Sequence, residues 1–361
     1  MSRRPTLRDV SLLAGVSAKT VSRVVNDDPA VAPGTAERVR AAIRELRFHP
    51  NPVARSLRVG RDDAIGLVVE NIADPFMAEV TGAVEEVARK RGMFVVIASA
   101  GYAPENERVV VSGLTNRRVA GLIITPTSGD HSYFQHLAAR LPTVFVDRPP
   151  IQHDVDTVLV DNEGGAGMAT RHLIDHGHRR IAFVGDRPHI YTTRLRYQGF
   201  RAAMLDAGLP VDERLVRIDA MGAHNYTDAM TDLLELENEP TAVLSANMLA
   251  SLGVVRALHL RARTDMAHVS FDDFPAAESL NPPVTAVSQD PQRLGRQAAS
   301  LLLDRINGET SPPRRVVLPV RLIVRGSGEL RPPGCRQPKS STSTPLRHGS
   351  TMAAVPTRPP D

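Results

Sequence analysis

Apolar side chains in the first fifty residues recur every three or four positions, which predicts short helices. Two apolar stripes, each expected to be the buried face of one helix, comprise Leu7, Val10, Leu13 and Ala14, and Val16, Val21, Val24 and Val25. Gly15 lies between the stripes, where a helix must end and the chain must reverse. Thr6, with Asp9 three residues later, and Ser17 are the expected N-caps. Residues 6–26 are therefore predicted to form two helices joined by a tight turn.

A third helix is expected after the polar turn at 27–29. Pro33 fits its first turn, and Ala36, Val39, Ile43 and Leu46 follow at helical spacing. Phe48 should close the small core, which gives a head over residues 1–49. A helix-turn-helix of this shape can place its second helix in the DNA major groove, with Ala18, Lys19, Ser22 and Arg23 facing outward. A generic helical hairpin is the alternative at this point.

Residues 50–61 are predicted to be a hinge between two domains. Asn51 and Pro52 form a helix start, and Gly60 ends the segment after about two turns. A helix this short is marginal in water, so it should form only when something holds it. With Leu57 between two arginines, it suits a minor-groove element whose apolar side chain wedges between base steps. The alternative is a plain linker.

From residue 62 to 330, short apolar β-branched runs alternate with helical segments. The runs lie at 65–69, 94–98, 121–124, 143–146, 157–160, 181–184, 242–244 and 269–271. The helices are expected at 76–91, 104–117, 163–176, 194–207, 227–236 and 248–259. This alternation predicts an α/β body of doubly wound parallel sheets, and its length favours two lobes. A helix at 291–307 and a strand near 315–325 would return across the lobes, and residues 331–361 are predicted to be a disordered basic tail.

Composition places the chain among ordinary globular proteins, with 42% hydrophobic and 23% charged residues. Its net charge of +4 divides unevenly: residues 1–60 carry 11 basic and 5 acidic side chains, whereas residues 61–330 carry 28 and 34. A basic head on an acidic body favours a polyanion partner. The sequence contains no secretory signal or membrane-length apolar run, and Cys335 is its single cysteine. A cytoplasmic protein is expected.

The sequence contains only incomplete enzyme motifs. His172 and His176, near His178, lack the glutamate of the metalloprotease pattern. The glycine-rich run at 163–167 matches neither dinucleotide nor P-loop motifs, and adjacent carboxylates at 272–273 are a weak metal signal. No catalytic residue, metal or cofactor is therefore expected.

Polar residues at predicted strand ends instead suggest a binding cleft. Asp147, Asn247 and Asp272 each follow a strand, while Phe76 opens a helix and Arg196 lies on another. Carboxylate and amide acceptors, an arginine fork and an aromatic face suit a small polyol, sugar or nucleoside-like ligand between two lobes. Each residue alone is equally explained as a cap or a surface group.

Several segments, among them TLRDVSLLAGVSAKTVSRVVN, HLIDHGHRRIAFVG, VSFDDF and PPVTAVSQD, resemble the LacI/GalR family of bacterial repressors over roughly residues 5–327. The resemblance implies a homodimer, possibly a higher oligomer, that binds near-palindromic double-stranded operator DNA, with a body like periplasmic sugar-binding proteins. It assigns base reading to Ala18, Lys19 and Arg23, the minor-groove wedge to Leu57, and the ligand pocket to Phe76, Arg196, Asn247 and Asp272, with Asp147 as a further candidate. The full set expected at DNA is Thr6, Ser17, Ala18, Lys19, Thr20, Ser22, Arg23, Asn26, Asn51, Ala54, Arg55, Leu57 and Arg58.

Four positions depart from the family pattern. Met248 stands where an aspartate is usual, His268 occupies a normally apolar strand position, and Ala32 replaces a common capping residue. The segment between Leu258 and Leu260 is about three residues short. The resulting prediction is a transcriptional repressor controlled by a sugar or related polar metabolite. A solute-binding protein without a DNA role and a sugar-acting enzyme are the alternatives.

Overall fold

The computed structural model describes residues 5–25, 28–48, 63–127, 131–135, 141–219 and 223–333. Predictions for Asn26, for the hinge residues Asn51, Ala54, Arg55, Leu57 and Arg58, and for the tail beyond residue 333 lie outside these ranges. Within them, no helix combines the length and apolar character needed to cross a membrane.

The head contains the three predicted helices, α1 (Leu7–Ala14), α2 (Ala18–Val25) and α3 (Pro33–Glu45). The caps are those predicted. Oγ1 of Thr6 accepts the amide of Asp9 at 3.4 Å, and a carboxylate oxygen of Asp9 accepts the amide of Thr6 at 2.7 Å. Oγ of Ser17 accepts the amide of Thr20 at 3.1 Å. Gly15 has a φ of 65°, a left-handed conformation that glycine adopts without strain.

The core of the head contains fewer buried residues than the apolar stripes predict. Val10, Val21, Val39 and the predicted plug Phe48 are buried, but Leu7 and Leu13 are 36% and 46% exposed. Their prediction as buried residues is therefore wrong. An eight-residue helix presents little more than one i, i+4 row to its neighbours, and in α1 that row is Val10 and Ala14.

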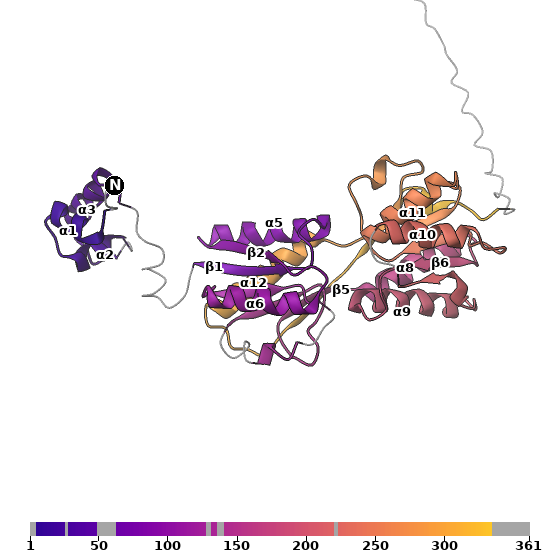
Figure 1. Ribbon diagram of the computed structural model, residues 1–361, viewed down its shortest axis with the longest axis horizontal. Helices are drawn as coiled ribbons and strands as arrows, with labels where there is room; N and C mark the ends of the chain where they lie inside the picture. Colours follow the sequence, from indigo (N-terminus) through magenta and orange to yellow (C-terminus); the bar gives the residue numbers. More distant parts are fainter. Residues whose placement is uncertain are drawn as a thin grey trace, which may run out of the picture.

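The body has two lobes, as Figure 1 shows. Each lobe is built on a six-stranded sheet. The first lobe contains β1 (Ala64–Val69), α5 (Pro75–Lys90), β2 (Phe94–Ser99), α6 (Pro104–Asn116), β3 (Gly121–Ile124), β4 (Thr143–Val146), β5 (Thr157–Val160), α12 (Pro291–Ile306) and β11 (Arg315–Leu318). Its strand order is β11-β5-β4-β3-β1-β2, and every pairing is parallel. α5 and α6 cover opposite faces (Figure 1).

The second lobe repeats this plan. It contains α8 (Asn162–Asp175), β6 (Ile181–Val184), α9 (Tyr191–Asp206), η1 (Glu213–Leu215), β7 (Val216–Arg217), α10 (Ala223–Leu234), β8 (Ala242–Ser245), α11 (Met248–Leu260), β9 (Ala267–Phe271), η2 (Ala277–Ser279), β10 (Thr285–Ser288), β12 (Arg321–Ile323) and η3 (Ser327–Glu329). The strand order is β12-β10-β9-β8-β6-β7, with β12 antiparallel to β10. The predicted doubly wound parallel sheets are therefore confirmed, with one antiparallel strand at this edge of the second lobe.

The chain crosses between the lobes three times, between β5 and α8, between β10 and α12, and between β11 and β12. The predicted strand at 315–325 is therefore two strands in different sheets. Val320, in the two-residue connection, packs against the cores of both lobes. The expected return of the last helix is confirmed, because α12 packs on α5 and on β3, β4 and β5.

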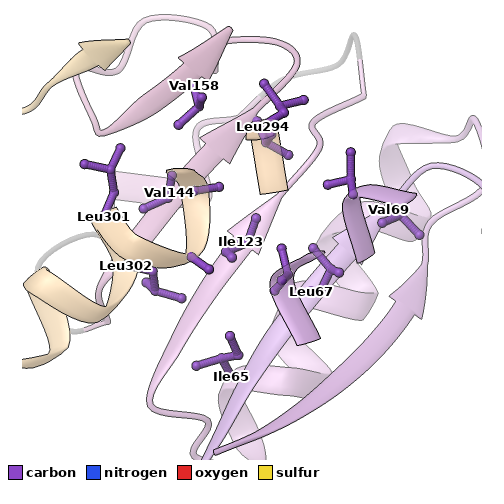
Figure 2. Packing of buried hydrophobic residues seen from close by; sticks show 14 of the residues in the cluster. Ile65, Leu67, Val69, Ile123, Val144, Val158, Leu294, Leu301 and Leu302 are labelled. Carbon is purple, nitrogen blue, oxygen red and sulfur yellow. The ribbon is translucent and has the colours of Figure 1, made fainter. Parts of the chain in front are cut away.

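Both faces of each central strand are buried, which explains their continuous apolar runs. Figure 2 shows Ile65 and Leu67 of β1 in one core with Val144 of β4 and with Leu294 and Leu302 of α12. The corresponding core of the second lobe includes Phe183, Phe200 and Phe271.

Two family departures have local explanations. α11 continues without interruption to Leu260, which is 68% exposed, so a shortened segment there alters only the surface end of the helix. His268 is buried in β9, where its Nε2 is 2.8 Å from Oγ of Ser245. Burial lowers the pKa of His268 to about 3, so the ring is neutral.

Candidate functional site

The five residues predicted for ligand binding line a single cavity between the lobes. Phe76 comes from α5 in the first lobe and Asp147 follows β4, while Arg196, Asn247 and Asp272 come from the second lobe. The cavity, here called the cleft, has a volume of about 70 Å³. Because parallel strands end on one edge of a sheet, side chains distant in sequence meet where two such edges face each other.

Two of the carboxylates sit on tight backbone turns at the strand ends. Asp147 has a φ of 69° and Asp272 a φ of 76°, a left-handed conformation that aspartate tolerates better than most residues. The amide of Asp272 still bonds the carbonyl of Val287 at 2.9 Å. The turn therefore begins directly after the last sheet hydrogen bond.

Arg196 is held from several sides. Its Nε donates to Oδ1 of Asn162 at 2.8 Å, and one terminal nitrogen donates to the carbonyl of Ala246 at 2.6 Å. The guanidinium carbon lies 3.8 Å from the ring centroid of Phe271. The same terminal nitrogen is 3.6 Å from Oδ2 of Asp272. The residue is only 3% exposed, so its fork is fixed in place.

Asn247 is both a cap and a cleft residue. Its Oδ1 accepts the amide of Ala250 at 2.8 Å, which starts α11, and its Nδ2 donates to Oδ2 of Asp186 at 2.7 Å. The hydroxyl of Tyr226 donates to the other oxygen of Asp186. The asparagine amide is therefore oriented by protein groups on both sides.

The cleft contains residues that the sequence analysis missed, chiefly Glu70 after β1, Arg148 after β4, Asp186 after β6 and Gln289 after β10. All follow strands, so the rule that found Asp272 would also have found them. Arg148 donates two hydrogen bonds to Glu70, at 2.5 and 2.7 Å. Burial opposes the charged form of Arg148, but Glu70 and Asp147 outweigh it and raise its pKa.

Two buried polar atoms at the cleft lack hydrogen-bond partners in the described part of the chain. They are Oε1 of Gln289, an acceptor from the second lobe, and Nε of Arg148, a donor from the first lobe, which lies 3.3 Å from Oδ2 of Asp147 as an ion pair but makes no hydrogen bond. The amide nitrogen of Gln289 donates to Asp272, which orients the free oxygen. Buried unsatisfied groups are costly, and a polar ligand would satisfy both.

The cleft is rich in carboxylates. Among the described residues that line it, Glu70, Asp74, Asp147, Asp186 and Asp272 are acidic, against Arg148 and Arg196. Burial raises the pKa of Asp74 to about 6, and the charges of Asp272 and Asp147 act in the same direction. Burial also raises the pKa of Asp272, although Arg196 opposes it. Such a surface accepts hydrogen bonds from hydroxyl groups and repels anions.

His172 and Asp273, two candidate metal ligands in the sequence, are paired with other protein side chains. Nε2 of His172 is paired with Glu329, and Asp273 forms an ion pair with Arg325 at 2.6 Å. Within the described ranges, no group of three or more metal-ligating side chains is arranged to hold an ion.

In the head, α2 presents the predicted DNA-contacting side chains to solvent. Ala18, Lys19 and Arg23 are exposed, and Ser22 is half-buried. Nε of Arg23 lies 3.3 Å from Oδ2 of Asp28. The capping roles of Thr6 and Ser17, and the contact of Oγ1 of Thr20 with Oγ of Ser17 at 2.9 Å, fix the ends of both helices.

Comparison with known proteins gives two family matches. Residues 6–51 match the model described as "Bacterial regulatory proteins, lacI family", and residues 62–325 match "Periplasmic binding proteins and sugar binding domain of LacI family". The HTH-type transcriptional regulator CelR of Thermobifida fusca is 40% identical over 337 residues, which cover 90% of this chain and 99% of the relative.

Two solved structures extend the comparison. A transcriptional regulator CelR–cellobiose complex is 35% identical and has a TM-score of 0.67, with coverage of 90% of this chain and 100% of the other. A Lac repressor dimer bound to operator and the anti-inducer ONPF is 28% identical and has a TM-score of 0.82, with coverage of 90% and 99%.

Proposed function

Because this chain belongs to the LacI family of bacterial transcriptional regulators, we propose that it is a repressor whose operator binding is controlled by a neutral sugar held between its lobes. The observation that carries the sugar assignment is the composition of the cleft. Carboxylate oxygens, an arginine fork and an aromatic ring surround a space to which both lobes contribute. Sugar hydroxyls are donors and acceptors, so they can pair with such groups without bringing charge.

The proposal gives each predicted pocket residue a role. Asp147 and Asp272 accept sugar hydroxyls, Arg196 donates to ring or hydroxyl oxygens, and Phe76 supplies an apolar face. Asn247 contacts the ligand and transmits its position to α11, which it caps. Nε of Arg148 and Oε1 of Gln289, which have no hydrogen-bond partner among the described residues, complete the set. In this proposal the cleft binds its ligand and does not catalyse a reaction on it.

At DNA, we assign the base contacts to Lys19 and Arg23, with Ala18 against a thymine methyl group. To contact the edge of a guanine, Arg23 must break its ion pair with Asp28. A bidentate contact with the guanine then replaces that ion pair. The segment 51–58 would enter the minor groove with Leu57 as the wedge. A regulator of chromosomal DNA acts in the cytoplasm.

The proposed repressor is a homodimer that reads a near-palindromic operator. The edge strand β2 supports this part of the proposal because its exposed side chains are apolar, with the exception of Ser99 at its end. Phe94 is 76% exposed, Val96 and Ile97 are 36% and 38% exposed, and Val109 on the neighbouring α6 is 70% exposed. Exposed apolar edge strands of this kind are normally buried against another protein surface.

The test is a mobility-shift measurement of the full-length protein on DNA from around its own gene. Nanomolar binding to one near-palindromic site, with a shift in affinity when cellobiose, glucose or galactose is added, is expected. Glucose 6-phosphate should leave the affinity unchanged because the cleft repels anions. Sugar binding without any specific DNA site would favour a solute-binding protein instead.

A further inference from the structure

A second and larger hollow adjoins the cleft. It shares Phe76, Met248, Asp272 and Gln289 with the cleft, and its volume is about 310 Å³. We call it the annex. The cleft alone, at about 70 Å³, is far below the roughly 300–1,000 Å³ that small-molecule sites occupy. The two spaces together reach the lower end of that range.

One wall of the annex is apolar and aromatic. Phe274 and Met248, each 5% exposed, form a cluster with Ala277 and Val284, and Phe76 of α5 packs against it from the other lobe. Met248 replaces the aspartate that the family pattern leads one to expect. The passage from the cleft to the annex therefore runs over apolar surface rather than past a further carboxylate.

The remaining walls are polar. Glu79 of α5 and Glu278 of η2 line the annex from opposite lobes, and the Asp273–Arg325 ion pair, with contacts of 2.6 and 2.7 Å, closes one side. An apolar face beside hydroxyl acceptors matches a sugar ring, whose C–H face packs on aromatic groups while its hydroxyls donate.

We propose that the annex is a second sugar subsite, so that the effector is a neutral disaccharide or longer oligosaccharide. One ring lies in the cleft against Arg196 and Asp272, and the next lies on Phe274 and Met248 between Glu79 and Glu278. This assignment rests on the proposed sugar-controlled function and defines the size class of the sugar.

The annex also makes the shift in lobe arrangement depend on the size of the ligand. Its walls come from both lobes, and Phe76 meets the Phe274 cluster only while the lobes lie as they do here. A ligand can shift an equilibrium only by its differential affinity for the two states. A disaccharide that contacts both walls therefore favours this lobe arrangement more strongly than a monosaccharide.

The test is calorimetric titration of the full-length protein with glucose, galactose, cellobiose, maltose and lactose. At least one disaccharide is expected to bind about tenfold or more tightly than its component monosaccharides. Phe274→Ala should reduce that disaccharide's affinity about tenfold and leave monosaccharide affinity within about twofold. Because Phe274 is buried, the double variant Glu79→Gln/Glu278→Gln, at two exposed positions, provides a second test with the same expected pattern. Glu105→Gln on α6 is the matched control.

Equal affinity for monosaccharides and disaccharides, or equal losses for both in the Glu79→Gln/Glu278→Gln variant, would show that the annex holds no sugar ring. The sugar-controlled repressor would still stand in that case. If none of the five sugars binds while specific operator binding persists, the sugar class of the proposed function is wrong, and the annex assignment fails with it.

Discussion

Arg196 shows how the second lobe fixes a cleft residue before any ligand is present. Asn162 at the start of α8, the carbonyl of Ala246 after β8 and the ring of Phe271 at the end of β9 all contact its guanidinium group. Most of its conformational freedom is therefore lost on folding rather than on binding. Preorganised donors of this kind reduce the ordering cost of association.

The sequence predicted part of this residue set. Asp147, Asn247 and Asp272 were predicted because each lies within two residues of a strand end. Glu70, Asp186 and Gln289 obey the same rule and were not predicted. The pairing of Asp186 with Asn247 and Tyr226 was beyond prediction. It depends on how β6, β8 and α10 lie side by side, which no local pattern encodes.

Gln289→Ala should lower the affinity for the effector sugar about tenfold. The change removes the free acceptor Oε1 and also the amide that donates to Asp272. Operator affinity without sugar should stay unchanged, since Gln289 is far in the chain from the head. Calorimetry and mobility shift measure the two quantities. Gln292→Ala, at an exposed position of α12, is the control, and equal sugar affinity in both variants would contradict the role of Gln289.

Asp74→Asn should flatten the pH dependence of stability. Burial raises the folded-state pKa of Asp74 to about 6, against about 3.9 in an unfolded chain, so between these values the folded protein binds more protons. The free energy of unfolding therefore falls as the pH rises from about 4 to 6. Asparagine can still accept the amide of Phe76, which Asp74 accepts at 2.9 Å, but it does not titrate.

Urea unfolding at pH 4.5 and pH 7 measures this effect. The drop in stability between them should shrink by on the order of 1 kcal/mol, a value reduced for the partial exposure of Asp74. Asp161→Asn, at an exposed cap of α8, is the matched control. A wild-type pH profile in Asp74→Asn would show that the carboxyl titrates as it does in the unfolded chain.

At the scale of elements, periodicity located helices and strands but not their partners. The apolar run at 315–325 is a single strand by pattern, yet its halves belong to different sheets with Val320 between them. The prediction that Leu7 is buried was wrong for a related reason. The pattern identifies an apolar stripe on the helix but does not say how much of that stripe the neighbouring helices cover. The packing of α12 on α5 likewise joins segments some 200 residues apart.

Gly295→Ala should destabilise the first lobe by about 2–4 kcal/mol. A Cβ at this position would lie 2.5 Å from the carbonyl oxygen of Val80 and 2.9 Å from Cβ of Ala83, so α12 and α5 would have to separate. Gly82→Ala on the exposed side of α5 is the control, since a Cβ there meets nothing within 4 Å and alanine favours helix by roughly 1 kcal/mol. Thermal and urea unfolding of both variants measure the difference, and equal stabilities would contradict the close approach.

At the scale of the whole molecule, the three connections between the lobes make coupled motion the natural response to a ligand. The connections β5–α8, β10–α12 and β11–β12 all leave from the carboxyl ends of strands. A ligand held by both lobes changes their mutual placement, and a dimer converts that change into the spacing of its heads. Two rigid lobes with short connections favour hinge movement over local deformation.

Phe94→Glu should dissociate the proposed dimer. Phe94 is 76% exposed on the edge strand β2, so the substitution spares the fold but places two like charges near the symmetry axis of a paired edge. The dimer dissociation constant is expected to rise about 100-fold by analytical ultracentrifugation, and operator affinity should fall with it because the heads are no longer paired. Calorimetric sugar affinity should persist. Leu205→Glu, 54% exposed on α9, should change none of these quantities. A Phe94→Glu protein that remains dimeric would place the interface on another face of the molecule.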